Sequence, residues 1–284
     1  MVSSAKSLVR RSDHPVCAFR TMHYTTLIFD AFDTVVHINE SKLPTYRVDG
    51  KVVPTTAPAV HAAYTNLFRK VDFDVFYSAF SQSYIQVNTR RRGDLKEIPS
   101  QHRFKTMLDL LGHPSHEITD NVIETITRAH MAQLSESFEV RPETIEVLRW
   151  AKARYRTAMI SNFGYAPALY DALDQFGIRS AFETIVVSVE VGWCKPHRMI
   201  FDQTFERMRV RPSEALFVGD QIYLDVYGAL SCGMDVVWIE TARQDSMAWL
   251  PTGVEEHMCK PTYTVRSISE LVPLLEKTGG ARAR

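Results

Sequence analysis

Asp30 is the residue whose type and position most clearly offer chemistry. It follows Thr25-Thr-Leu-Ile-Phe29, a short apolar run typical of a strand that is buried on both faces of a parallel sheet. Ligands of open α/β sheets bind beyond the carboxyl ends of such strands, so a carboxylate there is a candidate nucleophile for covalent catalysis. Aspartate after a strand also commonly serves in a turn or a helix cap, so this interpretation depends on the rest of the chain.

The elements that would position Asp30 form an alternating pattern of strands and helices after residue 140. Asn162 follows directly after one of these strands, and Asp220 follows another after a single glycine. The pattern predicts a doubly wound parallel sheet, an α/β fold with right-handed crossovers. Strands are predicted at 157–161, 183–188, 215–218 and 235–239, and helices at 142–154, 166–176, from about 196, and from after Asp220 to Gly233.

A mostly helical segment interrupts this pattern between the first strand and the second. It opens with an Asp49-Gly50 turn between two β-prone arms, which predicts a hairpin. Apolar residues then recur at three- and four-residue spacing, as on one face of an amphipathic helix. Helices are predicted at 56–70, from 73 to at least 87, at 100–111 and at 116–135. We therefore predict an α-helical cap at 41–139, an α/β core formed by 24–40 and 140–284, and a flexible extension at 1–23.

Composition narrows the class of protein and of partner. The 284 residues are 45% hydrophobic and 23% charged with a formal net charge of zero, so charge gives no reason to propose nucleic acid or membrane binding. No apolar run approaches the roughly 20 residues of a membrane span. The four scattered cysteines suggest neither a disulfide scaffold nor a zinc site, and favour a reducing cytoplasm: Cys17, Cys194, Cys232 and Cys259. We expect a small anionic substrate and a monomer or homodimer.

Four short motifs, taken together, resemble the haloacid dehalogenase-like (HAD) hydrolase superfamily. The resemblance runs from about residue 24 to 275 and implies a Rossmann-like core whose cap closes over the active site. In chain order the motifs are Asp30-Ala-Phe-Asp-Thr34, Ser161-Asn162, Gly192-Trp-Cys-Lys195-Pro196 and Val218-Gly-Asp220-Gln-Ile-Tyr-Leu-Asp225-Val-Tyr-Gly-Ala229.

The resemblance also implies a role for each motif residue. Asp30 would attack phosphorus or carbon and form an acyl-phosphate or ester that water then cleaves. Thr34, Ser161 and Lys195 would contribute hydrogen bonds and positive charge. Magnesium, which prefers oxygen ligands, is the implied cofactor. Its predicted ligands are Asp30, the backbone carbonyl of Phe32, Asp220 and, as a ligand or a supporting group, Asp225.

Phe32 departs from the superfamily pattern. Most superfamily phosphatases carry a second aspartate at this position, which protonates the leaving oxygen, and losing such an acid costs about 10²- to 10⁴-fold in rate. Asp33, a cap residue or a leaving group of low pKa would have to compensate. Superfamily dehalogenases also carry an aromatic residue here, but they work without metal and lack an acidic fourth motif.

Three functions therefore remain open from the sequence. They are magnesium-dependent hydrolysis of a small phosphorylated metabolite, metal-independent displacement at carbon of the 2-haloacid dehalogenase kind, and binding without catalysis. A phosphonatase would need a cap lysine, for which Lys70, Lys96 and Lys105 are candidates. The candidate substrate-binding residues are Arg91, Arg103 and Asn162. The two arginines are candidates because a guanidinium group suits carboxylate or phosphate.

Overall fold

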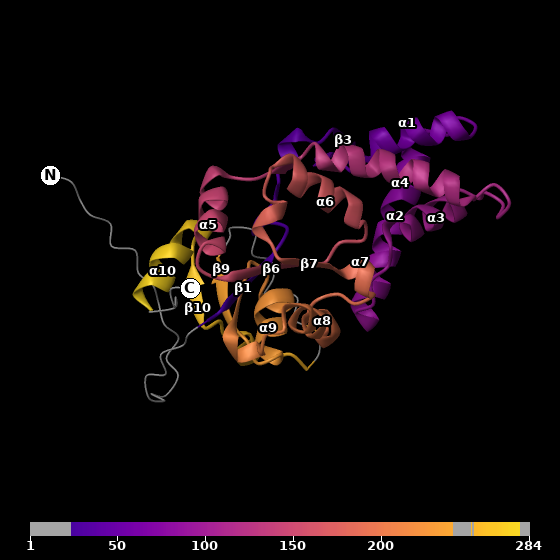
Figure 1. Ribbon diagram of the computed structural model, residues 1–284. Helices are drawn as coiled ribbons and strands as arrows, with labels where there is room; N and C mark the ends of the chain where they lie inside the picture. The colour runs from indigo at the N-terminus through magenta and orange to yellow at the C-terminus, as the bar shows by residue number, and fades with distance from the viewer. Residues whose placement is uncertain (1–23, 241–250, 252, 279–284) are drawn as a thin grey trace.

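The computed structural model describes residues 24–240, 251 and 253–278, so the predicted extension at 1–23 lies outside the described residues. Its core is a six-stranded parallel sheet in the order β10-β9-β8-β1-β6-β7, and helices lie on both faces (Figure 1). The predicted α/β fold is confirmed, and β10 is a strand that the sequence analysis missed. The strands are β1 (Thr26–Asp30), β6 (Arg156–Ser161), β7 (Thr184–Val187), β8 (Ala215–Gly219), β9 (Asp235–Ile239) and β10 (Tyr263–Val265).

β1 lies at the centre of the sheet, hydrogen-bonded to β6 on one side and to β8 on the other. All five of its residues are buried. Because successive side chains of a strand point to opposite faces, Leu27 and Phe29 join one hydrophobic cluster while Ile28 joins the other. This burial on both faces explains why the strand is a continuous apolar run.

The helices that cover the sheet divide between its two faces. One cluster includes residues of α5 (Pro142–Lys152), α6 (Ala166–Gln175) and α10 (Leu271–Lys277). The other includes residues of α8 (Arg198–Met208) and α9 (Gly228–Ser231), and a short α7 (Ser188–Val191) follows β7. Short 3₁₀ turns lie at Glu40–Lys42, Arg179–Ala181, Pro212–Glu214, Glu256–Cys259 and Ile268–Glu270.

The helix predicted between Asp220 and Gly233 is present at Ile222–Ser231, but its first part is not an α-helix. Ile222–Tyr227 winds as a π-helix, and only Gly228–Ser231 continues as α-helix. A π-helical turn is wider than an α-helical one and is frequent at functional sites. Here it carries Asp225, whose side chain turns back toward Gly219 at the end of β8.

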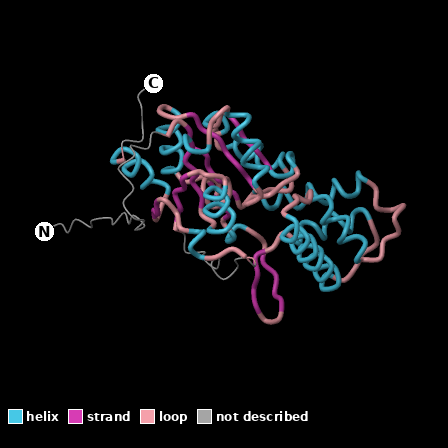
Figure 2. The backbone as a smooth tube through the Cα atoms, turned by 90° about the horizontal axis from the view of Figure 1, so that it is seen from below, coloured by secondary structure: helices cyan, strands magenta, loops and turns pink. Residues whose placement is uncertain are grey.

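The helical cap contains α1 (Ala57–Leu67), α2 (Phe73–Asp94), α3 (Ser100–Leu110) and α4 (Asp120–Ser135), and the hairpin is formed by β3 (Thr45–Val48) and β4 (Lys51–Pro54). These helices share a hydrophobic cluster separate from those of the sheet, and Figure 2 shows the helical part beside the core. Two short strands, β2 (His37–Ile38) and β5 (Phe138–Glu139), pair where the chain passes between cap and core. The limits 41 and 139 stay a prediction.

Among the described residues, no helix has both the length and the apolar character needed to cross a bilayer.

Candidate active site

A buried cluster of charged side chains lies beyond the carboxyl ends of β1 and β8. The ammonium group of Lys195 donates hydrogen bonds to Asp30 and to Oδ1 of Asp225, the latter at 2.7 Å. It also lies 3.4 Å from the carbonyl oxygen of Ile160 on β6. Lys195 thus lies between a residue of the first motif, a residue of the fourth motif and the strand β6, which precedes the second motif.

Asp225 holds this part of the chain together with both of its carboxylate oxygens. While Oδ1 accepts from Lys195, Oδ2 accepts from the backbone N–H groups of Asp220 at 3.1 Å and Gln221 at 2.9 Å. Gly219 permits this approach, because a Cβ atom at that position would lie only 2.5 Å from Oδ2. Asp225 therefore fixes the loop that presents Asp220.

The charges in the cluster strongly perturb one another. Burial raises the pKa of Asp30 to about 7 against the opposing effect of Lys195, and burial together with the Asp30 and Asp225 carboxylates raises the pKa of Asp220 to about 9. Burial alone would lower the pKa of Lys195, but Asp225 and Asp30 raise it above its ordinary value. One ammonium group thus faces three carboxylates, and the cluster favours additional positive charge.

The cluster has the chemistry of a magnesium site. Ligand atoms of Asp30, Asp220 and Asp225 lie within 4.8 Å of one another, and Oδ1 of Asp220 is buried without a hydrogen-bond partner among the described residues. Carboxylate oxygens of this kind suit Mg²⁺. Because both oxygens of Asp225 are already engaged, that residue fits a supporting role better than a direct ligand. The carbonyl oxygen of Phe32 stays a predicted ligand.

Two hydroxyl groups of the predicted site are also buried and unsatisfied. Oγ1 of Thr34 and Oγ of Ser161 make no hydrogen bond with any described residue, although both side chains are essentially inaccessible. A buried hydroxyl without a partner costs roughly 1–3 kcal/mol. Their open hydrogen-bonding capacity fits an anionic ligand that would complete the site, and their predicted roles remain predictions.

Asn162 contacts the peptide backbone of Lys195 with both ends of its side-chain amide. Its Oδ1 accepts from the Lys195 N–H at 2.7 Å, and its Nδ2 donates to the Lys195 carbonyl oxygen at 3.0 Å. These contacts position the lysine rather than a ligand. Substrate binding by Asn162 stays a prediction that no observed contact favours.

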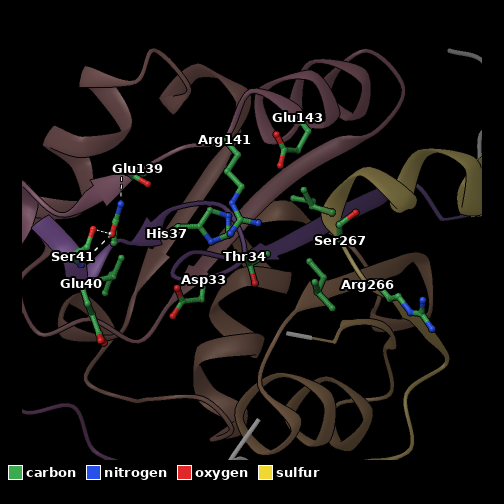
Figure 3. Close-up of a pocket in the computed structure, with 14 residues that line it drawn as sticks. Asp33, Thr34, His37, Glu40, Ser41, Glu139, Arg141, Glu143, Arg266 and Ser267 are labelled. Carbon is green, nitrogen blue, oxygen red and sulfur yellow. Dashed lines mark hydrogen bonds between the residues drawn. The ribbon is translucent and has the colours of Figure 1, made fainter. Parts of the chain in front are cut away.

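Phe32 places an aromatic ring where most superfamily phosphatases have an acid. Its ring centroid lies 4.8 Å from that of Phe163 and 5.3 Å from that of Phe138. The next residue, Asp33, has a positive φ of 61°, a conformation that aspartate adopts more readily than most side chains. Asp33 and Thr34 line a cavity of about 540 Å³, with His37 and Arg141 on its neighbouring wall (Figure 3).

The two candidate arginines lie in different surroundings within the cap. Arg91 lines a cavity of about 300 Å³ together with Lys195 and Asn162, and it contacts Asn88 at 2.6 Å and Glu97 at 3.4 Å. Arg103 instead lies over the ring of Phe80, 4.2 Å from its centroid. Burial lowers the pKa of Arg103 to about 10.

The cap lysines and Cys194 can also be placed. Lys105 pairs with Asp109 at 2.9 Å on the exposed side of α3, and Lys96 lies over the ring of Trp193. Burial and then the Glu97 carboxylate raise the pKa of the Cys194 thiol, which disfavours the reactive thiolate. None of these contacts supplies a Schiff-base lysine or a nucleophilic cysteine.

Sequence reasoning missed Glu97 and Ser188, which contact the loops of the site. Their side chains are hydrogen-bonded to each other, and Ser188 also accepts from the backbone N–H of Phe163 at 2.8 Å. Glu97 stands in a short connection between two helices, where an acid is ordinarily exposed to solvent. No local pattern distinguishes it from a surface residue.

The fold and this cluster define a class of protein, an α/β protein with a doubly wound parallel sheet, an inserted helical cap and acidic groups at the carboxyl edge of the sheet. The chain belongs to the haloacid dehalogenase-like hydrolase family, whose model matches residues 24–233. The family predicted from the four motifs is therefore confirmed.

Individual relatives include a phosphatase and a nucleotidase, and a dehalogenase is among the solved structures that share the fold. The chain is 27% identical over 224 residues to pyrimidine 5'-nucleotidase YjjG of Escherichia coli, covering 76% of this chain and 92% of that protein. It is 30% identical over 135 residues to a glyceraldehyde 3-phosphate phosphatase of Pyrococcus furiosus, covering 48% of this chain and only about half (53%) of that relative. A 2-haloacid dehalogenase of Pseudomonas syringae superimposes with a TM-score of 0.60 at 16% identity, over 89% of this chain and 99% of that one, which shows the shared fold.

Proposed function

We propose that this protein is a magnesium-dependent phosphatase that hydrolyses a small phosphorylated metabolite. The observation that carries the proposal is the buried cluster in which Asp30 and Asp220 lie close together beside Lys195. An acidic cluster of this kind suits a divalent cation with a bound phosphoryl group. It suits less well the reaction of a haloacid, which takes place at an uncharged carbon and needs no cation. The relatives named as phosphatase and nucleotidase favour the same reaction. A cytoplasmic location stays a prediction.

The proposed reaction has two steps at phosphorus. An oxygen of Asp30 forms a bond to phosphorus while the bond to the leaving oxygen breaks, which gives an aspartyl phosphate and the leaving group as its oxyanion, which then takes a proton from water. A water molecule then bonds to phosphorus, the bond to Asp30 breaks, and inorganic phosphate leaves. Lys195 orients the Asp30 carboxylate, and the Thr34 and Ser161 hydroxyls are available to donate to phosphoryl oxygens. Bound magnesium would offset negative charge on the phosphoryl group.

The proposed substrate is small and has a good leaving group. The cavity beside Lys195 holds about 300 Å³, which is at the small end of ligand sites, and Arg91 on its wall suits a second anionic group. Phe32 offers no proton to the departing oxygen. A leaving group that is stable without protonation, such as a phenolate or a carboxylate, should therefore react fastest.

A second candidate is carbon-centred hydrolysis of the dehalogenase kind, and Phe32 is the observation that favours it. A halide leaving group needs no proton, so an aromatic residue at this position would cost that reaction nothing. Asp220 opposes it, because a second buried carboxylate beside Asp30 would disfavour an anionic substrate unless a cation balanced the charge.

Turnover of a substrate panel separates these candidates. We would measure phosphate release from p-nitrophenyl phosphate and acetyl phosphate with magnesium or with EDTA, and halide release from 2-haloacids. Phosphate release that requires magnesium and vanishes in Asp30→Asn is the expected result. Halide release that is indifferent to EDTA would replace the proposal with the second candidate, and ligand binding without any turnover would indicate a non-catalytic protein.

A further inference from the structure

A three-residue segment of the cap, Leu95–Glu97, pairs with the loop that precedes Lys195. We name this segment the clasp. The N–H of Glu97 donates to the Gly192 carbonyl at 3.0 Å, and the N–H of Cys194 donates to the Leu95 carbonyl at 2.8 Å. Lys96 and Trp193 form an antiparallel bridge between these two bonds. Cap and core are therefore joined by backbone hydrogen bonds beside the candidate active site.

The side chain of Glu97 reinforces this junction. It is only 1% exposed, and a buried carboxylate is costly unless donors surround it. Four donors do so here. Ser188 Oγ donates to it, Cys194 Sγ lies at 3.1 Å, the N–H of Ile98 at 2.9 Å, and a guanidinium nitrogen of Arg91 at 3.4 Å.

These contacts reach both loops that determine where Lys195 lies. Through Cys194, Glu97 holds the residue directly before the lysine in the chain. Through Ser188, it holds the N–H of Phe163, the residue directly after Asn162. Asn162 in turn binds the Lys195 backbone with both ends of its amide. The Glu97 carboxylate is thus linked to Lys195 in two ways, through Cys194 and through the contact of Ser188 with the loop that carries Asn162.

We propose that Glu97 is a positioning residue, which aligns Lys195 with Asp30 when the clasp of the cap is docked on the core. The effect on turnover rests on the proposed function, whereas the docking itself does not. The consequence is a coupling between cap position and chemistry, since the ammonium group reaches its working position only while cap and core are joined at this point.

Glu97→Ala and Glu97→Gln test the coupling, and Glu124→Ala is the matched control. Glu124 also joins cap to core, because it accepts from the hydroxyl of Tyr165 at 2.9 Å, but among the described residues it makes no hydrogen bond to Lys195, Cys194 or Asn162. Glutamine keeps acceptor and donor capacity while losing the charge. We expect Glu97→Ala to lower kcat about 10- to 100-fold with a small change in KM, and Glu97→Gln to recover part of the loss. Glu124→Ala should keep kcat within about twofold of the wild type. Equal kinetic effects of Glu97→Ala and Glu124→Ala would overturn the proposal.

Alkylation of Cys194 gives a readout that needs no turnover. Cys194 is 3% exposed and contacts Glu97, and Cys232, which is 8% exposed and directly follows α9, serves as an internal reference. Iodoacetamide labelling followed by peptide mass spectrometry should show Cys194 reacting fastest in Glu97→Ala. Both Glu97 variants remove the charge that disfavours the thiolate, so the excess rate in alanine over glutamine reports undocking. Equal labelling rates of Cys194 in these two variants would contradict the proposed role of Glu97 in docking the clasp. This result would hold even if the wild type hydrolysed none of the phosphate esters.

Discussion

The ammonium nitrogen of Lys195 lies 2.7 Å from Oδ1 of Asp225, and both side chains are only 1% exposed. The lysine also contacts Asp30, so it supplies countercharge to a residue at the end of β1 and to a residue of the π-helical turn that follows β8. A buried pair of this kind is costly to break by removing one partner only, because the remaining charge stays buried. The two residues should therefore behave as a unit in stability as well as in catalysis.

Lys195→Met tests this relationship directly. Removing the ammonium group from among three carboxylates should lower the free energy of unfolding by about 3–5 kcal/mol and abolish turnover. Lys195→Met combined with Asp225→Asn should recover part of the stability, since the second change removes one of the stranded charges. Urea denaturation of both variants in EDTA measures the difference. If the separately measured effects of Lys195→Met and Asp225→Asn simply add in the double variant, the two residues are not energetically coupled.

Asp220 makes the stability of the metal-free protein dependent on pH. The pKa is raised to about 7 at Asp30 and about 9 at Asp220, so the folded state binds their protons more tightly than the unfolded state. The contribution of these two protonated carboxyl groups to the free energy of unfolding is fully present below about pH 4 and is lost as the pH rises through 7 to 9. In EDTA, thermal melting should show Tm falling over this range, and less steeply in Asp220→Asn.

Magnesium provides the control for that experiment. It should raise the Tm of the wild type at pH 8, because a ligand that binds only the folded state stabilises it, and should leave Asp220→Asn nearly unchanged. If the variant keeps the wild-type pH dependence and the full response to magnesium, Asp220 is not part of the cation site.

Asn162 should affect catalysis through the lysine it holds. Loss of two hydrogen bonds to the Lys195 backbone in Asn162→Ala should cost about 1–3 kcal/mol of stability and lower kcat about tenfold, with little change in KM. Asn162→Asp keeps the acceptor for the Lys195 N–H and should lose less stability. Steady-state kinetics and urea melts compare them. A large rise in KM at constant kcat would instead restore Asn162 as a substrate-binding residue.

The contrast between Asp30 and Asn162 shows how far the sequence could predict this site. Asp30 ends a strand whose apolar run is a local signal of burial on both faces, and the second and fourth motifs locate the ends of two more strands. The partner of Asn162, by contrast, lies 33 residues further along the chain and is selected by how two loops meet in three dimensions. Glu97 has a still weaker signal, since its burial depends on docking of the cap. The π-helical turn that carries Asp225 was missed because its residues have an ordinary helical pattern.

Arg91 should determine affinity for an anionic substrate. It lines the cavity beside Lys195, whereas its neighbour Arg90 is exposed on the same helix and serves as a matched control. Arg91→Ala should raise KM about tenfold or more if the guanidinium binds a substrate anion, and Arg90→Ala should leave KM unchanged. Arg91 also contacts Glu97. A fall in kcat without a change in KM would therefore mean that Arg91 acts by holding Glu97 in place and does not bind the substrate.

Phe32 should make the rate depend steeply on the leaving group. Its ring packs against Phe163 and Phe138 and can donate no proton, so wild-type kcat/KM should be at least about 10²-fold higher for p-nitrophenyl phosphate than for an alkyl phosphate. Phe32→Asp should narrow this ratio by supplying an acid, while Phe32→Leu, which keeps the site apolar, should preserve it. Similar wild-type rates on both esters would mean that another group protonates the leaving oxygen. Asp33 would then be the first residue to replace by asparagine, since it follows Phe32 and lines the adjoining cavity.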